Sequence, residues 1–157
     1  MIMMNWAIII VPVCLLFGNK QLVSADILKI TVAEVVVHAG KSSVIKMEIE
    51  IKEGYHIQAN KVKDDLLIPA TIEINEDKNI TTGRQEFPSA KKFKLEGTDD
   101  FLDVFDGVFE IRIPFKTIEK IPKGKYILNA KLHYQACDNR TCLFPKSIGF
   151  SIPLKII

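Results

Sequence analysis

The chain has 157 residues, of which 48% are hydrophobic and 25% are charged. This length and composition predict one globular domain that buries a core of its own without depending on cross-links. The formal net charge of +2 is too small for the strongly basic surface of a nucleic-acid-binding protein, so no nucleic-acid partner is expected.

The N-terminus has the pattern of an export signal. An apolar run from Trp6 to Phe17 is followed by a short polar patch and by Val23-Ser24-Ala25, whose small residues suit cleavage before Asp26. The run is too short to cross a bilayer, which argues against a retained anchor. The bulky residue before Cys14 argues against lipidation of that cysteine. We therefore predict a signal peptide at residues 1–25 and an exported domain at residues 26–157.

Short strands separated by turns are predicted along the rest of the chain. Apolar residues occupy alternate positions at residues 43–52 and again at 108–116. Pro69 suggests that the strand around it lies at a sheet edge or carries a bulge. No stretch has a convincing amphipathic helix pattern, so the expected fold class is all-β, an antiparallel β-sandwich. The expected strands are residues 27–37, 43–52, 66–74, 108–116, 126–136 and 147–157.

Residues 80–107 lack a strong strand pattern. They carry several glycines, Pro88 and the basic patch Lys91-Lys92-Phe93-Lys94, and a strand is suggested only at residues 91–95. Long irregular segments in compact domains are uncommon and are often lids or binding loops. From the residues alone, Phe101 and Phe105 are expected to plug into the core rather than to cover a site. The basic patch is expected to be a solvated face.

The segment from Tyr134 to Pro145 contains Cys137 and Cys142, which flank the four-residue tip of a predicted β-hairpin. If the two cysteines are directly opposed in an antiparallel pair, their Cα atoms should lie about 4.5 to 5.5 Å apart, which a disulfide can span. Alternation along residues 126–136 continues to Cys137 and puts this cysteine on the polar face of its strand, together with His133 and Gln135.

Three roles are conceivable for this cysteine pair. A structural bridge that closes so short a loop would contribute roughly 2 kcal/mol. A redox-active bridge would use the exposure of the tip, where Arg140 and Lys146 favour a thiolate and Asp138 opposes one. A zinc or copper site would need His133, which extended strand geometry places about 13 Å from Cys137. The spacing alone leaves the structural and redox roles open and disfavours the metal site.

The segment from Tyr134 to Cys137, followed after four residues by Cys142-Leu143-Phe144-Pro145, resembles the redox motif of the N-terminal periplasmic domain of DsbD-type thiol:disulfide interchange proteins. The cysteines are one residue closer together than in some members. Other segments fall in the same order as in that family, so the resemblance extends over nearly the whole chain from Asp26 to Ile157. These segments are Gly54-Tyr55-His56-Ile57 with the following Asn60-Lys61, Leu67-Ile68-Pro69-Ala70, Phe87-Pro88 and Phe105-Asp106-Gly107-Val108-Phe109-Glu110-Ile111.

This resemblance implies an immunoglobulin-like sandwich that acts as a thiol–disulfide oxidoreductase of the protein-disulfide reductase type. Cys142 would be the attacking thiol and Cys137 the resolving one. Phe105 would shield the disulfide as part of a cap loop, which reverses the expectation drawn from the residues alone. The residues expected at the site are the catalytic Cys137 and Cys142, the cap-loop residues Asp103, Phe105 and Gly107, and the supporting residues Tyr134 and Pro145.

The partners implied by the resemblance are thioredoxin-like or disulfide-isomerase proteins and a membrane-embedded electron donor. Because full-length members continue into a membrane domain and this sequence ends at Ile157, the donor is expected to be encoded separately. No cofactor or metal is expected. The expected location is the periplasm, and cytochrome c biogenesis is among the processes in which the domain is expected to act. Two alternatives are a non-catalytic immunoglobulin-like binding module with a structural disulfide, and copper or zinc handling through the same thiols.

Overall fold

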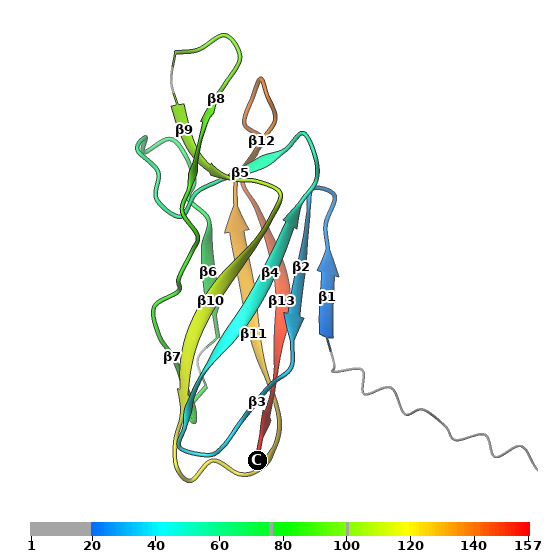
Figure 1. Cartoon of the computed structure of the whole chain (residues 1–157), viewed down its shortest axis with the longest axis vertical. Helices are drawn as coiled ribbons and strands as arrows, with labels where there is room; N and C mark the ends of the chain where they lie inside the picture. The colour runs from blue at the N-terminus through cyan, green and yellow to red at the C-terminus, as the bar shows by residue number, and fades with distance from the viewer. Residues whose placement is uncertain (1–19, 76, 100) are drawn as a thin grey trace, which may run out of the picture.

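The structure is a computed structural model that describes residues 20–75, 77–99 and 101–157. It is an elongated β-sandwich with two main sheets and a third, smaller sheet at one end (Figure 1). Within the described ranges the chain forms strands and no helix, and so has no helix there that could span a membrane. The all-β sandwich expected from the sequence is confirmed, and its architecture is immunoglobulin-like.

The first sheet is antiparallel throughout and centres on the long pair β4 and β10. In spatial order its strands are β1 (Lys20–Ser24), β2 (Leu28–Ala33), β4 (Ser42–Ile51), β10 (Val108–Thr117) and β7 (Ile80–Thr82). The predicted alternation of β4 is confirmed, because Ile45, Met47 and Ile49 are fully buried while Lys46 and Glu48 are exposed. Each of these buried side chains contributes roughly 1.5–3 kcal/mol to folding.

The second sheet packs against the first across the main core. In spatial order its strands are β3 (Val35–Val37), β13 (Lys146–Ile156), β11 (Gly124–Tyr134) and β6 (Thr71–Ile74). The predicted hairpin of β11 and β13 is confirmed, with a continuous register from Gly124 opposite Ile156 to Tyr134 opposite Lys146. β6 is shorter than the predicted strand of residues 66–74, because Pro69 has no backbone N–H to donate to a ladder.

Residues 27–37, predicted as one strand, form two strands in different sheets. β2 pairs with β4 in the first sheet, and after Glu34 the chain crosses over so that β3 runs parallel to β13 in the second. This parallel pair departs from the antiparallel expectation. The crossing ties the two sheets together through one short stretch of chain.

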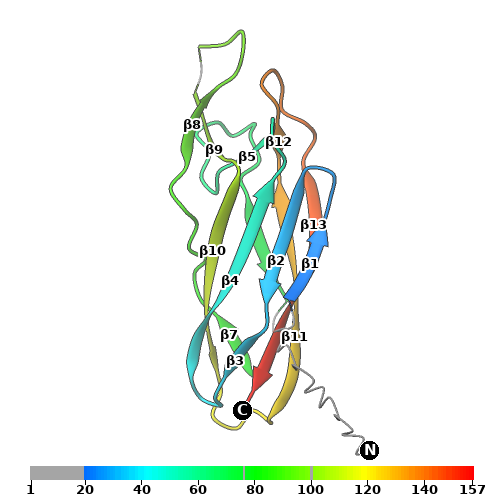
Figure 2. The same cartoon turned by 45° about the vertical axis from the view of Figure 1, so that its right-hand side comes forward.

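The third sheet stands at the end of the sandwich opposite the C-terminus (Figure 2). In spatial order its strands are β12 (Ala136–Cys137), β5 (His56–Gln58), β9 (Phe101–Phe105) and β8 (Lys91–Lys94). β8 confirms the strand suggested at residues 91–95. The expectation of a largely irregular 80–107 segment is wrong, because this segment also contains β7 and β9. β7 pairs with β10, which is distant in sequence, while β9 pairs both with the distant β5 and with β8, its partner in a local hairpin.

β1 includes residues that the predicted cleavage before Asp26 would remove. It is an edge strand that pairs with β2 from Lys20 opposite Ala33 to Ser24 opposite Lys29. Its side chains alternate between exposed and half-buried, so its loss would uncover one strand edge and little core. The apolar run from Trp6 to Phe17 lies outside the described residues. The signal peptide and the domain boundary therefore stay predictions.

Candidate functional site

Cys137 and Cys142 form a disulfide at the tip beyond the β11–β13 hairpin, with their Cα atoms 3.9 Å apart. The two residues are directly opposed, as predicted. Their Cα separation is shorter than the predicted 4.5 to 5.5 Å. The pair lies between two backbone hydrogen bonds, from Leu143 N–H to the Ala136 carbonyl at 2.7 Å and from Asp138 N–H to the Thr141 carbonyl at 3.0 Å. It therefore occupies the non-hydrogen-bonded position of a ladder, where opposed residues approach most closely.

The tip between the cysteines is held by Asp138. Its carboxylate accepts hydrogen bonds from the backbone N–H groups of Arg140 and Thr141, each at 2.8 Å. These two bonds hold the pKa of the Asp138 carboxyl below its usual range. Asp138 therefore mainly fixes the conformation of the loop, a role that could not be predicted from its charge alone.

Cys137 is fully buried, with 0% of its surface exposed. The prediction that it lies on the polar, wetter face is wrong. The alternation of β11 ends at Tyr134, and the chain then enters β12, which pairs with β5 of the third sheet instead of continuing the second. As a result Ala136 packs into the main core, while Cys137 packs with Leu102 and Val104 in a separate small cluster. Cys142 is half-buried at the edge of the same cluster.

The side-chain amide of Gln58 lies against both sulfurs. Its Nε2 donates to Cys137 Sγ at 3.2 Å and to Cys142 Sγ at 3.5 Å. Gln58 is itself fully buried, and its Oε1 has no hydrogen-bond partner. Gln58 is a site residue that the sequence alone did not predict. Its position two residues after His56, on the same face of a strand, was the one local signal that could have pointed to it.

His56 is the cross-strand partner of Cys137. Its ring is buried against Phe93, with the ring centroids 3.8 Å apart, and its Nε2 has no hydrogen-bond partner. Burial lowers the pKa of His56 below its ordinary value of 6.5, and the nearby Asp106 and Asp138 carboxylates oppose this effect. The imidazole is therefore held neutral beside the disulfide. A buried imidazole nitrogen without a hydrogen-bond partner is unusual in a folded protein.

Gln135 connects the cysteine loop to the neighbouring 60–70 loop. Its Oε1 accepts from Ile68 N–H at 2.9 Å, its Nε2 donates to the Leu143 carbonyl at 3.2 Å, and its backbone carbonyl accepts from Gln58 N–H at 2.9 Å. One side chain and one carbonyl therefore set the position of β5 and of both loops relative to the disulfide.

The two residues expected to support the site lie in different environments. Tyr134 is buried in the main core, where burial and, to a smaller extent, the charge of Asp26 raise the pKa of its phenol. Pro145 is exposed. The residue before it, Phe144, is 91% exposed and projects from the cysteine loop into solvent, as does Leu66, 85% exposed, from the neighbouring loop.

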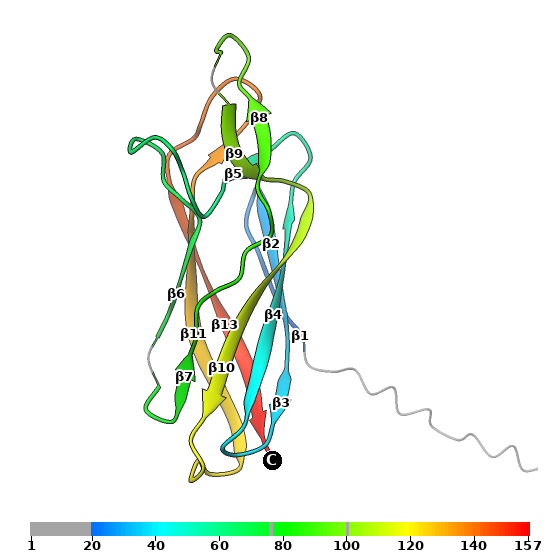
Figure 3. The same ribbon diagram turned by 60° about the vertical axis from the view of Figure 1, so that its left-hand side comes forward.

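The β8–β9 hairpin covers Cys137 from the other side. Leu102 and Val104 of β9 pack with Cys137, and Phe93 and Leu95 from β8 and the turn after it pack around them. Figure 3 shows the hairpin rising beside the cysteine loop at the same end of the sandwich. A cleft of about 380 Å³ opens between this hairpin and the 62–67 loop and reaches Gln58.

Two contacts join the tip of this hairpin to the cysteine loop. Glu96 N–H donates to the Asn139 carbonyl at 2.9 Å, and Arg140 Nε lies 3.3 Å from Glu96 Oε2. Both side chains of the ion pair are largely exposed, so it contributes at most about 1 kcal/mol. Beyond the apolar packing around Cys137, the tip of the hairpin is therefore held to the cysteine loop by one backbone hydrogen bond and one weak ion pair.

The three expected cap-loop residues lie in β9 and in the turn that follows it. Asp103 forms an ion pair with Lys92 across the hairpin, and Gly107 takes a positive φ of 61° at the turn into β10. Phe105 packs in the main core between Phe87 and Phe109, with centroid distances of 5.9 and 5.0 Å, and is not in the cluster around Cys137. Its shielding role stays a prediction. Phe101, expected in the core, is mostly exposed because it starts β9 at the rim of the cleft.

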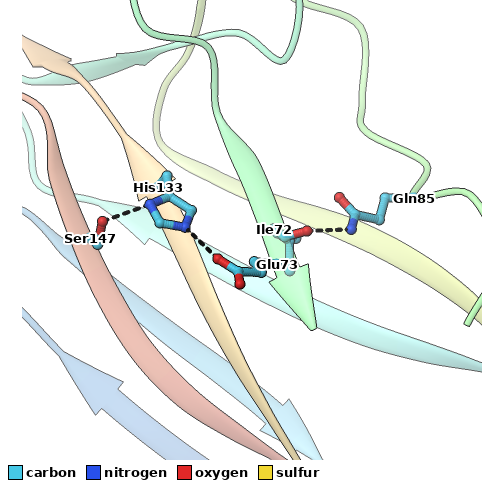
Figure 4. A network of polar contacts seen from close by, with 5 residues as sticks. All are labelled: Ile72, Glu73, Gln85, His133 and Ser147. Carbon is cyan, nitrogen blue, oxygen red and sulfur yellow. Dashed lines mark hydrogen bonds and ion pairs between the residues drawn. The ribbon is translucent and has the colours of Figure 1, made fainter. Parts of the chain in front are cut away.

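His133, the third ligand of the hypothetical metal site, points away from the cysteines. Its Nε2 lies 3.2 Å from Glu73 Oε2 and its Nδ1 lies 2.7 Å from Ser147 Oγ, on the outer face of the second sheet (Figure 4). Among residues 20–75, 77–99 and 101–157 no group of three metal-ligating side chains comes together. The metal alternative is therefore not favoured.

Comparisons with known proteins agree with this geometry. A solved structure, the N-terminal periplasmic domain of ScsB from Proteus mirabilis, superposes with a TM-score of 0.62 at 14% identity, which supports the fold. The match covers 86% of this chain and 51% of that one, so the chain spans about half the length of the ScsB structure. The reduced N-terminal domain of DsbD from Neisseria meningitidis matches with a TM-score of 0.43 at 15% identity, over 85% of this chain and 82% of that one.

A search among curated proteins found no match. The sequence of residues 24–152 matches the family described as thiol:disulfide interchange protein DsbD, N-terminal. This match runs from the end of β1 into β13 and includes the disulfide and the strands that surround it. The chain therefore belongs to the family of N-terminal domains of the thiol:disulfide interchange protein DsbD.

Proposed function

We propose that the chain is an exported thiol–disulfide exchange domain that passes reducing equivalents to disulfides of partner proteins through Cys137 and Cys142. The observation that carries this proposal is the placement of the bridge. It closes a loop with a sequence separation of 5 just beyond the end of the β11–β13 ladder, which already holds the two flanking segments together, so as a staple it would contribute roughly 2 kcal/mol. Such a bridge can open and close without loss of the sandwich.

The exchange proceeds in two steps. In the reduced domain the Cys142 thiolate attacks a partner disulfide, which forms a mixed disulfide and releases one partner sulfur as a thiolate. The Cys137 thiolate then attacks Cys142 Sγ, which re-forms the bridge and releases the second partner sulfur. The partner gains two electrons and takes up two protons to become a dithiol, and the domain is oxidised. A donor dithiol restores the reduced domain by the reverse steps.

The unequal exposure of the two sulfurs supports the assignment of these roles. Cys142 is half-buried, whereas Cys137 is fully buried and packs with Leu102 and Val104 of the β8–β9 hairpin. A partner sulfur can reach Cys142 with less rearrangement than Cys137. Cys142 is therefore the proposed attacking thiol, and Cys137 the proposed resolving thiol.

The cap role expected for residues Asp103 to Gly107 is carried over to the whole β8–β9 hairpin. Cys137 packs with Leu102, Val104 and Phe93, whereas Phe105 packs in the main core. The weak contacts of Glu96 with the cysteine loop allow the hairpin to move away when a partner approaches. We therefore propose that Phe93, rather than Phe105, is the aromatic side chain that shields the disulfide.

The exposed apolar side chains beside the disulfide are the proposed docking surface for the partner. Phe144 and Leu66 project from adjacent loops that Gln135 holds together. Apolar side chains this exposed often mark interaction sites. The partner class proposed from the family is a thioredoxin-like or disulfide-isomerase protein, and the proposed donor is a membrane-embedded dithiol protein. Export to the periplasm is supported by the apolar run before residue 25 and by the periplasmic origin of the ScsB domain.

Single replacements of the two cysteines test this function. We expect Cys137→Ser and Cys142→Ser to abolish reduction of an insulin or thioredoxin-like disulfide by the reduced protein. Cys137→Ser should in addition trap a mixed disulfide through Cys142, visible as a mass increase equal to that of the partner. The melting temperature should fall only modestly in both variants. A large loss of folding in both variants, with exchange absent from the wild type, would instead identify the bridge as a structural clip.

A further inference from the structure

Among the side-chain nitrogen and oxygen atoms of the described residues, two are buried without a hydrogen-bond partner, and both lie beside the disulfide. They are Gln58 Oε1 and His56 Nε2. His56 and Gln58 are two residues apart in β5, so their side chains lie on the same face, and His56 is directly opposite Cys137. A buried acceptor without a donor costs about 1–3 kcal/mol. The domain tolerates this cost next to its disulfide.

The oxidation state of the cysteines changes what these atoms can bind. A disulfide has no hydrogen to donate and its sulfurs are weak acceptors. Reduction by an external dithiol breaks the S–S bond and adds two electrons and up to two protons, so each sulfur becomes an S–H donor if it takes up a proton and a thiolate if it does not. A thiolate accepts a charge-assisted hydrogen bond, which is roughly twice as strong as a neutral one. Gln58 offers a donor to a thiolate through Nε2 and an acceptor to a thiol through Oε1.

We propose that Gln58 is a positioning residue that selectively stabilises the reduced, dithiol state of the Cys137 and Cys142 pair. Its Nε2 lies within hydrogen-bonding distance of both sulfurs, at 3.2 and 3.5 Å. It can therefore donate a hydrogen bond to whichever sulfur carries the negative charge during exchange. Its Oε1 accepts a hydrogen bond from the sulfur that remains protonated. This inference rests on the proposed exchange function, since it concerns the same pair.

The effect of Gln58 on the reduction potential has a definite sign. Because Gln58 stabilises the dithiol more than the disulfide, it makes the domain easier to reduce and raises its reduction potential. It also favours formation of the Cys137 thiolate that resolves the mixed disulfide. Other titratable or charged groups near the pair are His56 from β5, Asp106 from the turn after β9, Asp138 and Arg140 from the cysteine loop, and Glu96, the ion-pair partner of Arg140, from the tip of the β8–β9 hairpin. Lys63, Asp64 and Asp103 line the cleft that reaches Gln58. A Gln58 variant leaves all of them in place.

The test compares the full chain with Gln58→Leu, which removes both polar groups at similar volume, and with Gln58→Glu, which removes the N–H donor and adds a carboxyl. Gln85→Leu is the matched control, because Gln85 Nε2 donates to the Ile72 carbonyl at 2.6 Å and contacts no sulfur (Figure 4). Each protein is equilibrated with dithiothreitol buffers, and the reduced fraction is measured by thiol labelling. The pH profile of iodoacetamide alkylation is recorded for each reduced protein.

We expect Gln58→Leu to shift the equilibrium toward the disulfide by about tenfold, which corresponds to about 30 mV. Gln58→Glu should shift it at least as far, and both should move the alkylation profile to higher pH. Gln85→Leu should change neither. Equilibria and profiles within twofold of the wild type in both Gln58 variants would overturn the proposal. If Gln58→Leu does not fold, Gln58→Met, which is close in shape, carries the same comparison.

Failure of the proposed function has a different signature. In that case the wild type itself would not reduce a thioredoxin-like disulfide, whatever the Gln58 variants do to its equilibrium with dithiothreitol. If the wild type exchanges and the Gln58 variants match it in potential and alkylation profile, the exchange function stands and the role of Gln58 is wrong.

Discussion

Replacing Phe93 by alanine tests which side chains shield the disulfide. Phe93 lies in β8 opposite Leu102 of β9, and its ring covers His56 at a centroid distance of 3.8 Å. It also packs with the small cluster that contains Cys137. The substitution therefore removes contacts between the β8–β9 hairpin and the redox site, while the main core keeps all its side chains.

The size of the effect follows from the burial of this ring. Truncating a fully buried phenylalanine to alanine costs about 3–5 kcal/mol. Phe93 is half-buried, so its truncation should lower the stability of the closed hairpin relative to the open one by about 2 kcal/mol. If reduction requires the hairpin to move away, the open population rises by about 30-fold, because each 1.4 kcal/mol is a factor of ten. We expect the rate of reduction by a small dithiol to rise by up to that factor.

The assay follows the appearance of free thiols after addition of dithiothreitol to the oxidised protein. Phe105→Ala is the matched control, because it makes the same chemical change in the main core between Phe87 and Phe109. It should lower the melting temperature more than Phe93→Ala and accelerate reduction less. If Phe93→Ala leaves the rate within twofold of the wild type while Phe105→Ala raises it, Phe105 is the shield and Phe93 does not hold the hairpin closed over the disulfide.

Two further predictions concern the surroundings of the disulfide. Phe144→Ser should lower the rate of exchange with a thioredoxin-like partner several-fold without changing the rate with dithiothreitol, because Phe144 touches a docking protein and not the sulfurs; equal changes in both rates would exclude a docking role. Burial lowers the pKa of His56 against the opposing charges of Asp106 and Asp138, so the unfolded chain binds a proton near pH 6.5 where the folded chain does not. The stability that neutral His56 contributes is therefore complete above pH 6.5 and is lost as the pH falls from 6.5 toward the lower pKa of the folded state. Measured by urea unfolding from pH 7.5 to 5, the free energy of unfolding should fall less in His56→Phe than in the wild type.

The sandwich could be predicted from local pattern because its main strands are long and bury one face. β4 and β10 alternate over ten residues each, and the β11–β13 hairpin is continuous in sequence apart from its tip. Each of these elements carries enough alternate apolar residues to identify both the strand and its buried face. The fold class therefore followed from a few segments.

The redox site was less predictable because it is built from short strands whose partners are distant in sequence. β12 has two residues and β5 three, too few to show a period, and nothing local indicates that His56 lies opposite Cys137. The alternation of β11 also suggested a solvent-facing Cys137, since the chain changes sheets at Gln135 without a glycine or proline to mark the change. The resemblance to a family identified the cysteines and included His56, yet it did not single out Gln58.

This division between long and short pairings bears on how the domain works. β11 and β13 pair along their whole lengths, whereas β12 meets β5 at Ala136 and Cys137 and β5 meets β9 at Ile57 and Gln58. Local opening free energies are lowest where few buried contacts and few backbone bonds must be broken. The third sheet can therefore open around Cys137 while the sandwich stays folded. Such a sheet suits a disulfide that is shielded from small thiols and yet reached by a partner protein. The free energy needed to open the sheet is small, so the binding energy of the partner can offset it.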